Sequence, residues 1–113
     1  MSDRLPASVE ATALIRRAEA RGDFATVLRK GDEERGALLL VISSRGDHVA
    51  CLERLLSLDH GYRWRAVGPA AGAGSEELAG FLANRQRIDP DSWLIELDIA
   101  QPERFIAETT AGG

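Results

Sequence analysis

The sequence of 113 residues is poor in several residue types, and each shortage removes a class of protein from consideration. Its one cysteine, Cys51, has no partner for a disulfide within the chain, which agrees with a reducing compartment and predicts a cytoplasmic location. No apolar run approaches the roughly 18 residues that cross a bilayer. The segment from Met1 to Pro6 lacks the basic and apolar stretches of a signal peptide. We therefore expect no association with a membrane.

The chain also has fewer basic than acidic residues. The chain has 14 Lys and Arg against 18 Asp and Glu, so its formal net charge is −4, whereas proteins that bind nucleic acid usually carry a basic face. A nucleic-acid partner is therefore not expected. With 44% hydrophobic and 28% charged residues, the composition is that of one globular domain. We expect a single domain over residues 1–113, with an ordered core over 5–107 and a frayed tail over 108–113.

Hydrophobic periodicity predicts two helices, over residues 6–21 and 75–88, each with one apolar stripe. Gly22 is expected to end the first helix, and Ser75 is expected to cap the second. Apolar runs and alternations predict five strands, over residues 24–30, 37–43, 48–57, 62–67 and 93–99. The segment 48–57 also fits a helix, but the short turn before it favours a strand. A short helical turn is expected over residues 101–107.

The resulting order, α-β-β-β-β-α-β, predicts an α+β fold. Consecutive strands joined by short turns favour a five-stranded, mostly antiparallel sheet, with two helices packed on it. Side chains alternate between the two faces along each strand, which assigns the main core to one face. That face is expected to carry Phe24, Leu28, Leu38, Leu40, Ile42, Tyr62, Trp64, Trp93, Ile95 and Leu97.

The opposite face of the predicted sheet combines an apolar centre with a charged rim. Leu39, Val41 and Leu94 form the centre, and arginine and acidic side chains of neighbouring strands surround them. This is the composition of a protein interface, so one hypothesis is a homodimer formed through these three residues. The alternative is that one helix crosses this face and covers them within the monomer.

Several short segments of the chain resemble a known protein family. They are Leu14-Ile15-Arg16-Arg17-Ala18, Gly31-Asp32, Gly36, Gly61 followed by Trp64, and Asp89-Pro90-Asp91-Ser92-Trp93 with Glu96. Together they are similar to a family of small alphaproteobacterial proteins, the domain of unknown function 1491, over about residues 5–107. The resemblance implies a single-domain bacterial cytoplasmic protein without an established activity, and it assigns no catalytic residues.

No motif in the sequence forms a catalytic constellation. Gly72-Ala73-Gly74 lacks the Lys and Ser/Thr of a phosphate loop, and the two glutamates that follow would repel a phosphate. Asp47-His48 and Asp59-His60 lie about 26 Å apart along a strand, too far for a shared metal. Cys51 has no basic neighbour to activate its thiol and is expected to be buried. We predict no catalytic residues, no metal and no cofactor, while a hydrolase or transferase stays open as a further alternative.

Two functional hypotheses follow. The preferred one is a non-enzymatic binding or protein-interaction module with an unidentified protein partner. The alternative is a binder of anions, nucleotides or single-stranded nucleic acid that uses an arginine cluster, with Arg16, Arg17, Arg63 and Arg65 as its candidates. The alternation Tyr62-Arg63-Trp64-Arg65 would suit base stacking, but on a strand its aromatic side chains belong to the core side.

Overall fold

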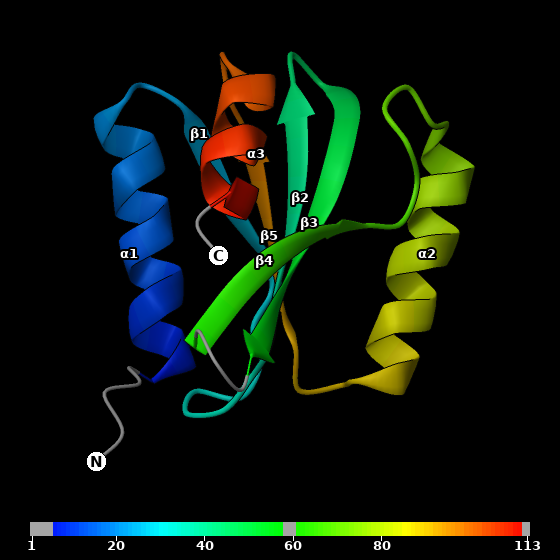
Figure 1. Ribbon diagram of the computed structural model, residues 1–113. Helices are drawn as coiled ribbons and strands as arrows, with labels where there is room; N and C mark the ends of the chain where they lie inside the picture. Colours follow the sequence, from blue (N-terminus) through cyan, green and yellow to red (C-terminus); the bar gives the residue numbers. More distant parts are fainter. Residues whose placement is uncertain (1–5, 58–60, 112–113) are drawn as a thin grey trace.

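The computed structural model describes residues 6–57 and 61–111, which form an α+β domain (Figure 1). The helices are α1 (Ala7–Ala20), α2 (Ser75–Ile88) and α3 (Pro102–Ala111). The strands are β1 (Phe24–Arg29), β2 (Leu38–Ser44), β3 (Asp47–Ser57), β4 (Gly61–Val67) and β5 (Trp93–Asp98). The predicted class and element order are confirmed, including a strand rather than a helix after Asp47. The short turn expected near residue 101 is instead the helix α3, and the expected frayed tail is helical as far as Ala111.

All five strands belong to one sheet in the order β1-β5-β2-β3-β4. Neighbours pair in antiparallel fashion in β1–β5, β2–β3 and β3–β4, whereas β2 and β5 run parallel. The parallel pair arises because the chain leaves the edge strand β4, crosses through α2 and returns to the middle of the sheet as β5. The sheet is therefore mostly antiparallel, as predicted.

The main core lies on the face of the sheet that α1 and α3 cover (Figure 1). Its buried members are Ala7, Ala11, Ala18, Leu38, Leu40, Ile42, Leu52, Trp93, Ile95, Leu97 and Ile99. The alanines form the inner side of α1 and let the helix approach the strands closely. Six of the ten predicted core residues are among these buried side chains, and Trp64 packs against them while half-buried. The side chain of Tyr62 lies outside the described residues.

Strand β1 is turned the other way from the prediction. Phe24 and Leu28 are 73% and 49% exposed, while Ala25 and Val27 pack against the core. The pairing with β5 explains this orientation, because Ala25 lies opposite Leu97 and directly paired residues share a face of the sheet. Phe24 and Leu28 make one alternating set of β1 the more apolar, so alternation by itself favours the wrong face of this strand.

Helix α2 covers the opposite face, and this corrects the predicted dimer interface. Leu39, Val41 and Leu94 are only 4%, 3% and 6% exposed. The side chains that cover them and Cys51 are Val67, Leu78, Phe81 and Leu82. The alternative of helix cover within the monomer is therefore confirmed, and these three residues are not free to meet a second copy while α2 is in place.

The ends of the helices depend on backbone groups. Helix α1 begins after Pro6, and the N–H groups of Ala7 and Ser8 donate to the carbonyl oxygens of Glu34 and Glu33 at 3.2 and 2.9 Å. The predicted cap by Ser75 is wrong, because Gly74 occupies the capping position, and among the described residues no side-chain hydrogen bond caps that end of α2. Of the helices in the described part of the chain, none combines the length and apolar character needed to span a bilayer.

Candidate functional site

The loop between β1 and β2 wraps around the indole of Trp93. The Trp93 Nε1–H donates to the carbonyl oxygen of Asp32 at 2.8 Å, and the Asp32 N–H donates to the carbonyl oxygen of Asp91 at 2.9 Å. A Cβ atom on Gly31 would lie 2.1 Å from that Asp91 oxygen, and one on Gly36 would lie 2.7 Å from Trp93 Cδ1. Both positions therefore require glycine. These residues, which carry the family resemblance, hold the entry to β5 in place and have a structural role.

The same loop orders its own backbone through the carboxylate of Asp32. Its Oδ1 accepts hydrogen bonds from the backbone N–H groups of Arg35 and Glu34, at 2.8 and 2.9 Å. These bonds favour the charged carboxylate, so they hold the pKa of Asp32 below its ordinary value of 3.8. The neighbouring carbonyl groups cap α1, and the loop thus connects the start of that helix to the sheet.

The four arginines proposed as an anion clamp do not come together. Arg16 and Arg17 are exposed on α1. Arg65 lies opposite Glu53 across the β3–β4 pair, and Glu53 in turn lies opposite Leu39, which faces α2. Arg65, and Arg63 two residues before it, therefore belong to the α2 side of the sheet, whereas α1 lies on the other side.

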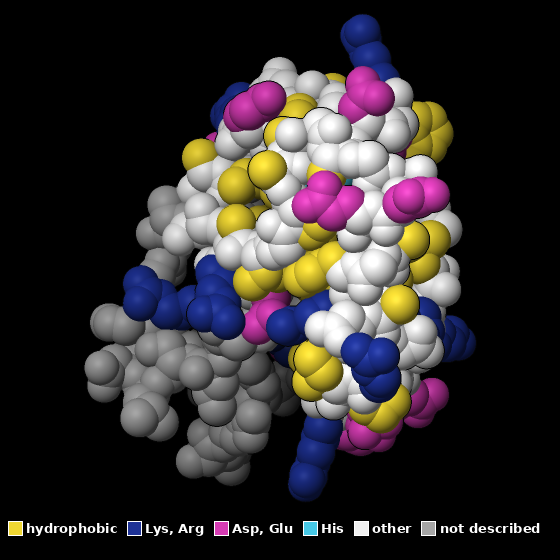
Figure 2. Space-filling view, turned by 90° about the vertical axis from the view of Figure 1, so that its right-hand side faces the viewer, with side chains coloured by type: hydrophobic (Ala, Val, Ile, Leu, Met, Phe, Trp, Pro, Cys, Tyr) yellow, Lys and Arg dark blue, Asp and Glu magenta, His cyan; other side chains and the backbone are white. Residues whose placement is uncertain are grey.

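The α2 side contains an ion-pair network centred on the buried Glu53, which is 7% exposed. Its carboxylate pairs with Arg85 of α2 and, at 3.6 Å, with Arg65 of β4. The Arg85 guanidinium also lies 6.0 Å from the centre of the Phe81 ring. In Figure 2, which shows this side of the molecule, basic and acidic side chains meet near the centre of the view. The network attaches α2 to the sheet, so Arg65 is engaged in a structural contact.

The histidine and cysteine candidates also occupy structural positions. The Nε2 of His48 donates to the carbonyl oxygen of Pro69 at 3.0 Å, which links β3 to the loop before α2. Asp59 and His60 lie outside the described residues. Cys51 is fully buried beneath α2, as predicted, and burial raises the pKa of its thiol from 9.0 to about 11. A neutral, enclosed thiol is a poor nucleophile.

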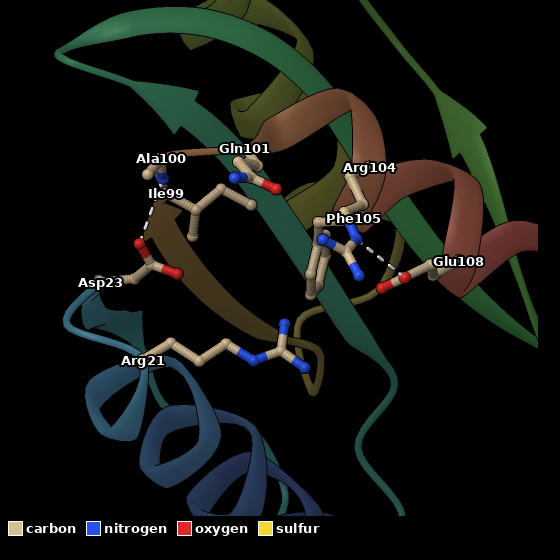
Figure 3. Close-up of a pocket in the computed structure, with 8 residues that line it drawn as sticks. All are labelled: Arg21, Asp23, Ile99, Ala100, Gln101, Arg104, Phe105 and Glu108. Carbon is tan, nitrogen blue, oxygen red and sulfur yellow. Dashed lines mark hydrogen bonds and ion pairs between the residues drawn. The ribbon is translucent and has the colours of Figure 1, made fainter.

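A cleft of 430 Å³ opens between the C-terminal end of α1 and helix α3 (Figure 3). Its lining residues are Arg21, Asp23, Ile99, Ala100, Gln101, Arg104, Phe105 and Glu108. A second pocket of 210 Å³ lies beside it and shares five of these residues. The residues that the second pocket adds are Leu14, Arg17, Ala18, Trp64, Leu97 and Thr109. The cleft lies within the volume range of small-molecule sites, about 300–1,000 Å³.

Some charged side chains of this cleft have hydrogen bonds or ion pairs within the protein, and one has none among the described residues. Arg104 Nε lies 3.1 Å from Glu108 Oε2, and Asp23 Oδ1 accepts a hydrogen bond from the Ala100 N–H at 3.1 Å. The side chain of Arg21, by contrast, has no hydrogen bond or ion pair with any residue that the structure describes. Figure 3 shows it extending from the end of α1 toward the side chains of α3. Arg21 is thus a cation in the cleft that is available to a ligand.

This site was not predicted from the sequence. Arg21 stands at the end of the helix expected over residues 6–21, and only a short helical turn was expected over residues 101–107. Asp23 and Ala100 are separated by 77 positions in the chain, and pairing of β1 with β5 brings them together. Part of the site does have a sequence signal, because Arg17 and Arg21 are four residues apart, which is one helical turn.

Fold and site together define a small α+β domain with a surface cleft of mixed polarity. The chain matches the family described as "Protein of unknown function (DUF1491)" over residues 5–107, and it belongs to that family. The resemblance noted in the sequence is therefore confirmed.

Solved structures of related proteins share this fold. A crystal structure of a DUF1491 family protein from Caulobacter crescentus CB15 is 33% identical, with a TM-score of 0.73 over 85% of this chain and 89% of that one. An NMR structure of a DUF1491 family protein from the same organism is 33% identical, with a TM-score of 0.71 over 83% and 84%. The solution structure of protein Atu0922 from A. tumefaciens is 29% identical, with a TM-score of 0.72 over 86% and 87%. No curated protein is similar enough in sequence to be a match.

Proposed function

We propose that this protein is a non-enzymatic binding module and that it binds a small anionic ligand in the cleft between α1 and α3. The observation that carries the proposal is the guanidinium of Arg21, which extends into the cleft and has no partner among the residues that the structure describes. A guanidinium presents several N–H donors in a planar fork, and this geometry matches a carboxylate or phosphate group.

The charges around the cleft favour a ligand with one negative charge. Across the cleft and the adjoining pocket there are three cations, Arg17, Arg21 and Arg104, against the two anions Asp23 and Glu108. Both anions already have partners within the protein. The excess of one positive charge therefore belongs to Arg17 of α1 and Arg21, which follows the last residue of that helix.

The chemistry of the lining residues supports binding rather than catalysis. The described residues that line the two pockets include neither cysteine, serine nor histidine; they offer three guanidinium groups, two carboxylates that already have partners, an amide, a threonine hydroxyl and apolar side chains. The protein partner and the cytoplasmic location expected from the sequence stay predictions, and a homodimer would have to form through a surface other than Leu39, Val41 and Leu94.

Backbone amide NMR of the full-length protein tests the proposal. We expect acetate, inorganic phosphate and hexanoate, added at millimolar concentrations, to shift resonances of residues 17–23 and 99–108. Arg21→Gln should abolish these shifts. Arg16→Gln provides a matched control, because Arg16 is an exposed arginine of the same helix that does not line the cleft. The proposal is overturned if none of the three anions shifts the cleft resonances, or if Arg21→Gln responds like the wild type.

A further inference from the structure

We infer that the ligand of this cleft is an amphipathic monocarboxylate, whose carboxylate meets Arg21 and whose apolar body enters the adjoining pocket; the inference rests on the proposed function. The two pockets differ in lining. The outer cleft, of 430 Å³, and the inner pocket, of 210 Å³, are each lined by four charged side chains, but the inner pocket has six apolar side chains against three in the outer cleft. The apolar side chains of the inner pocket are Leu14, Ala18, Trp64, Leu97, Ile99 and Phe105.

The two pockets form one continuous site. Arg21, Asp23, Ile99, Phe105 and Glu108 line both of them, so one molecule placed against these residues reaches both volumes. The charged group of such a molecule would lie at the α1 end, where Arg21 extends into the space (Figure 3).

The floor of the inner pocket belongs to the main core. Leu97 and Ile99 are only 1% and 5% exposed, and the half-buried Trp64, which also lines the pocket, packs against the same core cluster. At about 30 Å³ for each water in the liquid, the volume of 210 Å³ corresponds to about seven waters. That space suits a medium-length alkyl chain or a single ring, and it is too small for a long-chain lipid.

The choice of a carboxylate over a phosphate follows from the two acidic side chains. Asp23 and Glu108 stand at the same cleft as Arg21, so a doubly charged phosphate would meet two like charges, whereas a carboxylate carries one charge. A carboxylate also accepts two parallel hydrogen bonds from one guanidinium. Each methylene group buried in the inner pocket should raise the affinity about fourfold.

The test is a chain-length series with the full-length wild-type protein. Unbranched carboxylates from butanoate to decanoate are titrated below their micelle concentrations, and binding is followed by backbone amide NMR together with tryptophan fluorescence. The dissociation constant should fall about fourfold for each added methylene and then level off once the pocket is filled. Alcohols of equal length should bind at least tenfold more weakly, and Arg21→Gln should remove the difference between acid and alcohol.

Two substitutions locate the apolar end of the ligand. Trp64→Ala and Leu14→Gln should each flatten the dependence on chain length, and far-UV circular dichroism establishes that each variant is folded. Arg16→Gln should leave the whole series unchanged. If a variant does not fold, the inference is tested by the chain-length series with the wild-type protein alone.

The outcomes separate this inference from the proposed function. If acetate, phosphate and octanoate bind equally and all depend on Arg21, the amphipathic ligand is wrong while anion binding in the cleft stands. The inference of an amphipathic ligand is also wrong if octanoate shifts resonances away from the cleft, or if the affinities of the carboxylates do not depend on their chain length. If no anion binds, both proposals fail.

Discussion

The substitution Gly31→Ala adds only a methyl group, yet it should strongly lower the stability of the protein. A Cβ at this position would lie 2.1 Å from the carbonyl oxygen of Asp91, 2.6 Å from the carbonyl carbon of Ser92 and 2.7 Å from Trp93 Cδ1. Two of these three atoms are backbone, which has no other rotamer to adopt. The loop after β1 must therefore move away from the entry to β5.

The cost follows from what this movement breaks. The hydrogen bonds from the Asp32 N–H to Asp91 and from the Trp93 indole to Asp32 contribute about 1 kcal/mol each. Forcing an extra carbon against Trp93, which is 5% exposed, adds about 1–3 kcal/mol of packing strain. We expect a total loss of about 3–5 kcal/mol, a large part of the 5–15 kcal/mol that stabilises an ordinary domain.

Urea denaturation followed by far-UV circular dichroism and tryptophan fluorescence measures this loss. Gly80→Ala is the matched control, because Gly80 lies within α2 and a Cβ there meets nothing within 4 Å. The control should gain about 0.5–1 kcal/mol, since alanine stabilises a helix interior more than glycine does. A Gly31→Ala protein within about 1 kcal/mol of the wild type would refute the close-approach argument, given the error of such extrapolations.

Three further predictions concern buried or titrating side chains. Glu53→Ala leaves Arg85 without its carboxylate partner and should lower the free energy of unfolding in urea by about 1–3 kcal/mol, whereas no change would mean that the ion pairs do not stabilise α2. Cys51 is fully buried, with its pKa raised to about 11, so an aromatic disulfide reagent at neutral pH should label it only as fast as the protein unfolds. Immediate stoichiometric labelling of the native protein would contradict its burial. The lowered pKa of Asp32 stabilises the fold above the unfolded value of about 3.8, and this contribution disappears as the pH falls through the lower folded value. Asp32→Asn should therefore make stability less dependent on pH below about 4, measured by thermal unfolding, and an unchanged slope would count against this role.

Much of the fold was predictable because local patterns specify local structure. The run from Leu38 to Ile42 is apolar at every position, which indicates a central strand covered on both faces, and all five side chains are buried. The helical period of residues 6–21 and 75–88 similarly placed α1 and α2. The short connection before β3 favoured a hairpin, and β2 and β3 do pair in antiparallel fashion.

The orientation of β1 and the cover over the second face depended on contacts between distant segments. Phe24 and Leu28 make one face of β1 more apolar than the other, yet Ala25 and Val27 face the core because β1 pairs with β5 in that register. Leu39, Val41 and Leu94 looked like an interface, and the crossover through α2 covers them within the same chain. Neither outcome could be read from alternation, because alternation reports which residues share a face and not what lies against it.

The candidate site was decided by tertiary structure alone. Composition and spacing by themselves determined the α+β class, the element order and the absence of an internal disulfide. The cleft required β5 to lie between β1 and β2, since this position brings the end of α1 and the start of α3 to the same end of the sheet. Hydrophobic periodicity is a property of neighbouring residues, whereas strand order depends on which distant surfaces bury one another best, and that choice alone set Arg21 opposite α3.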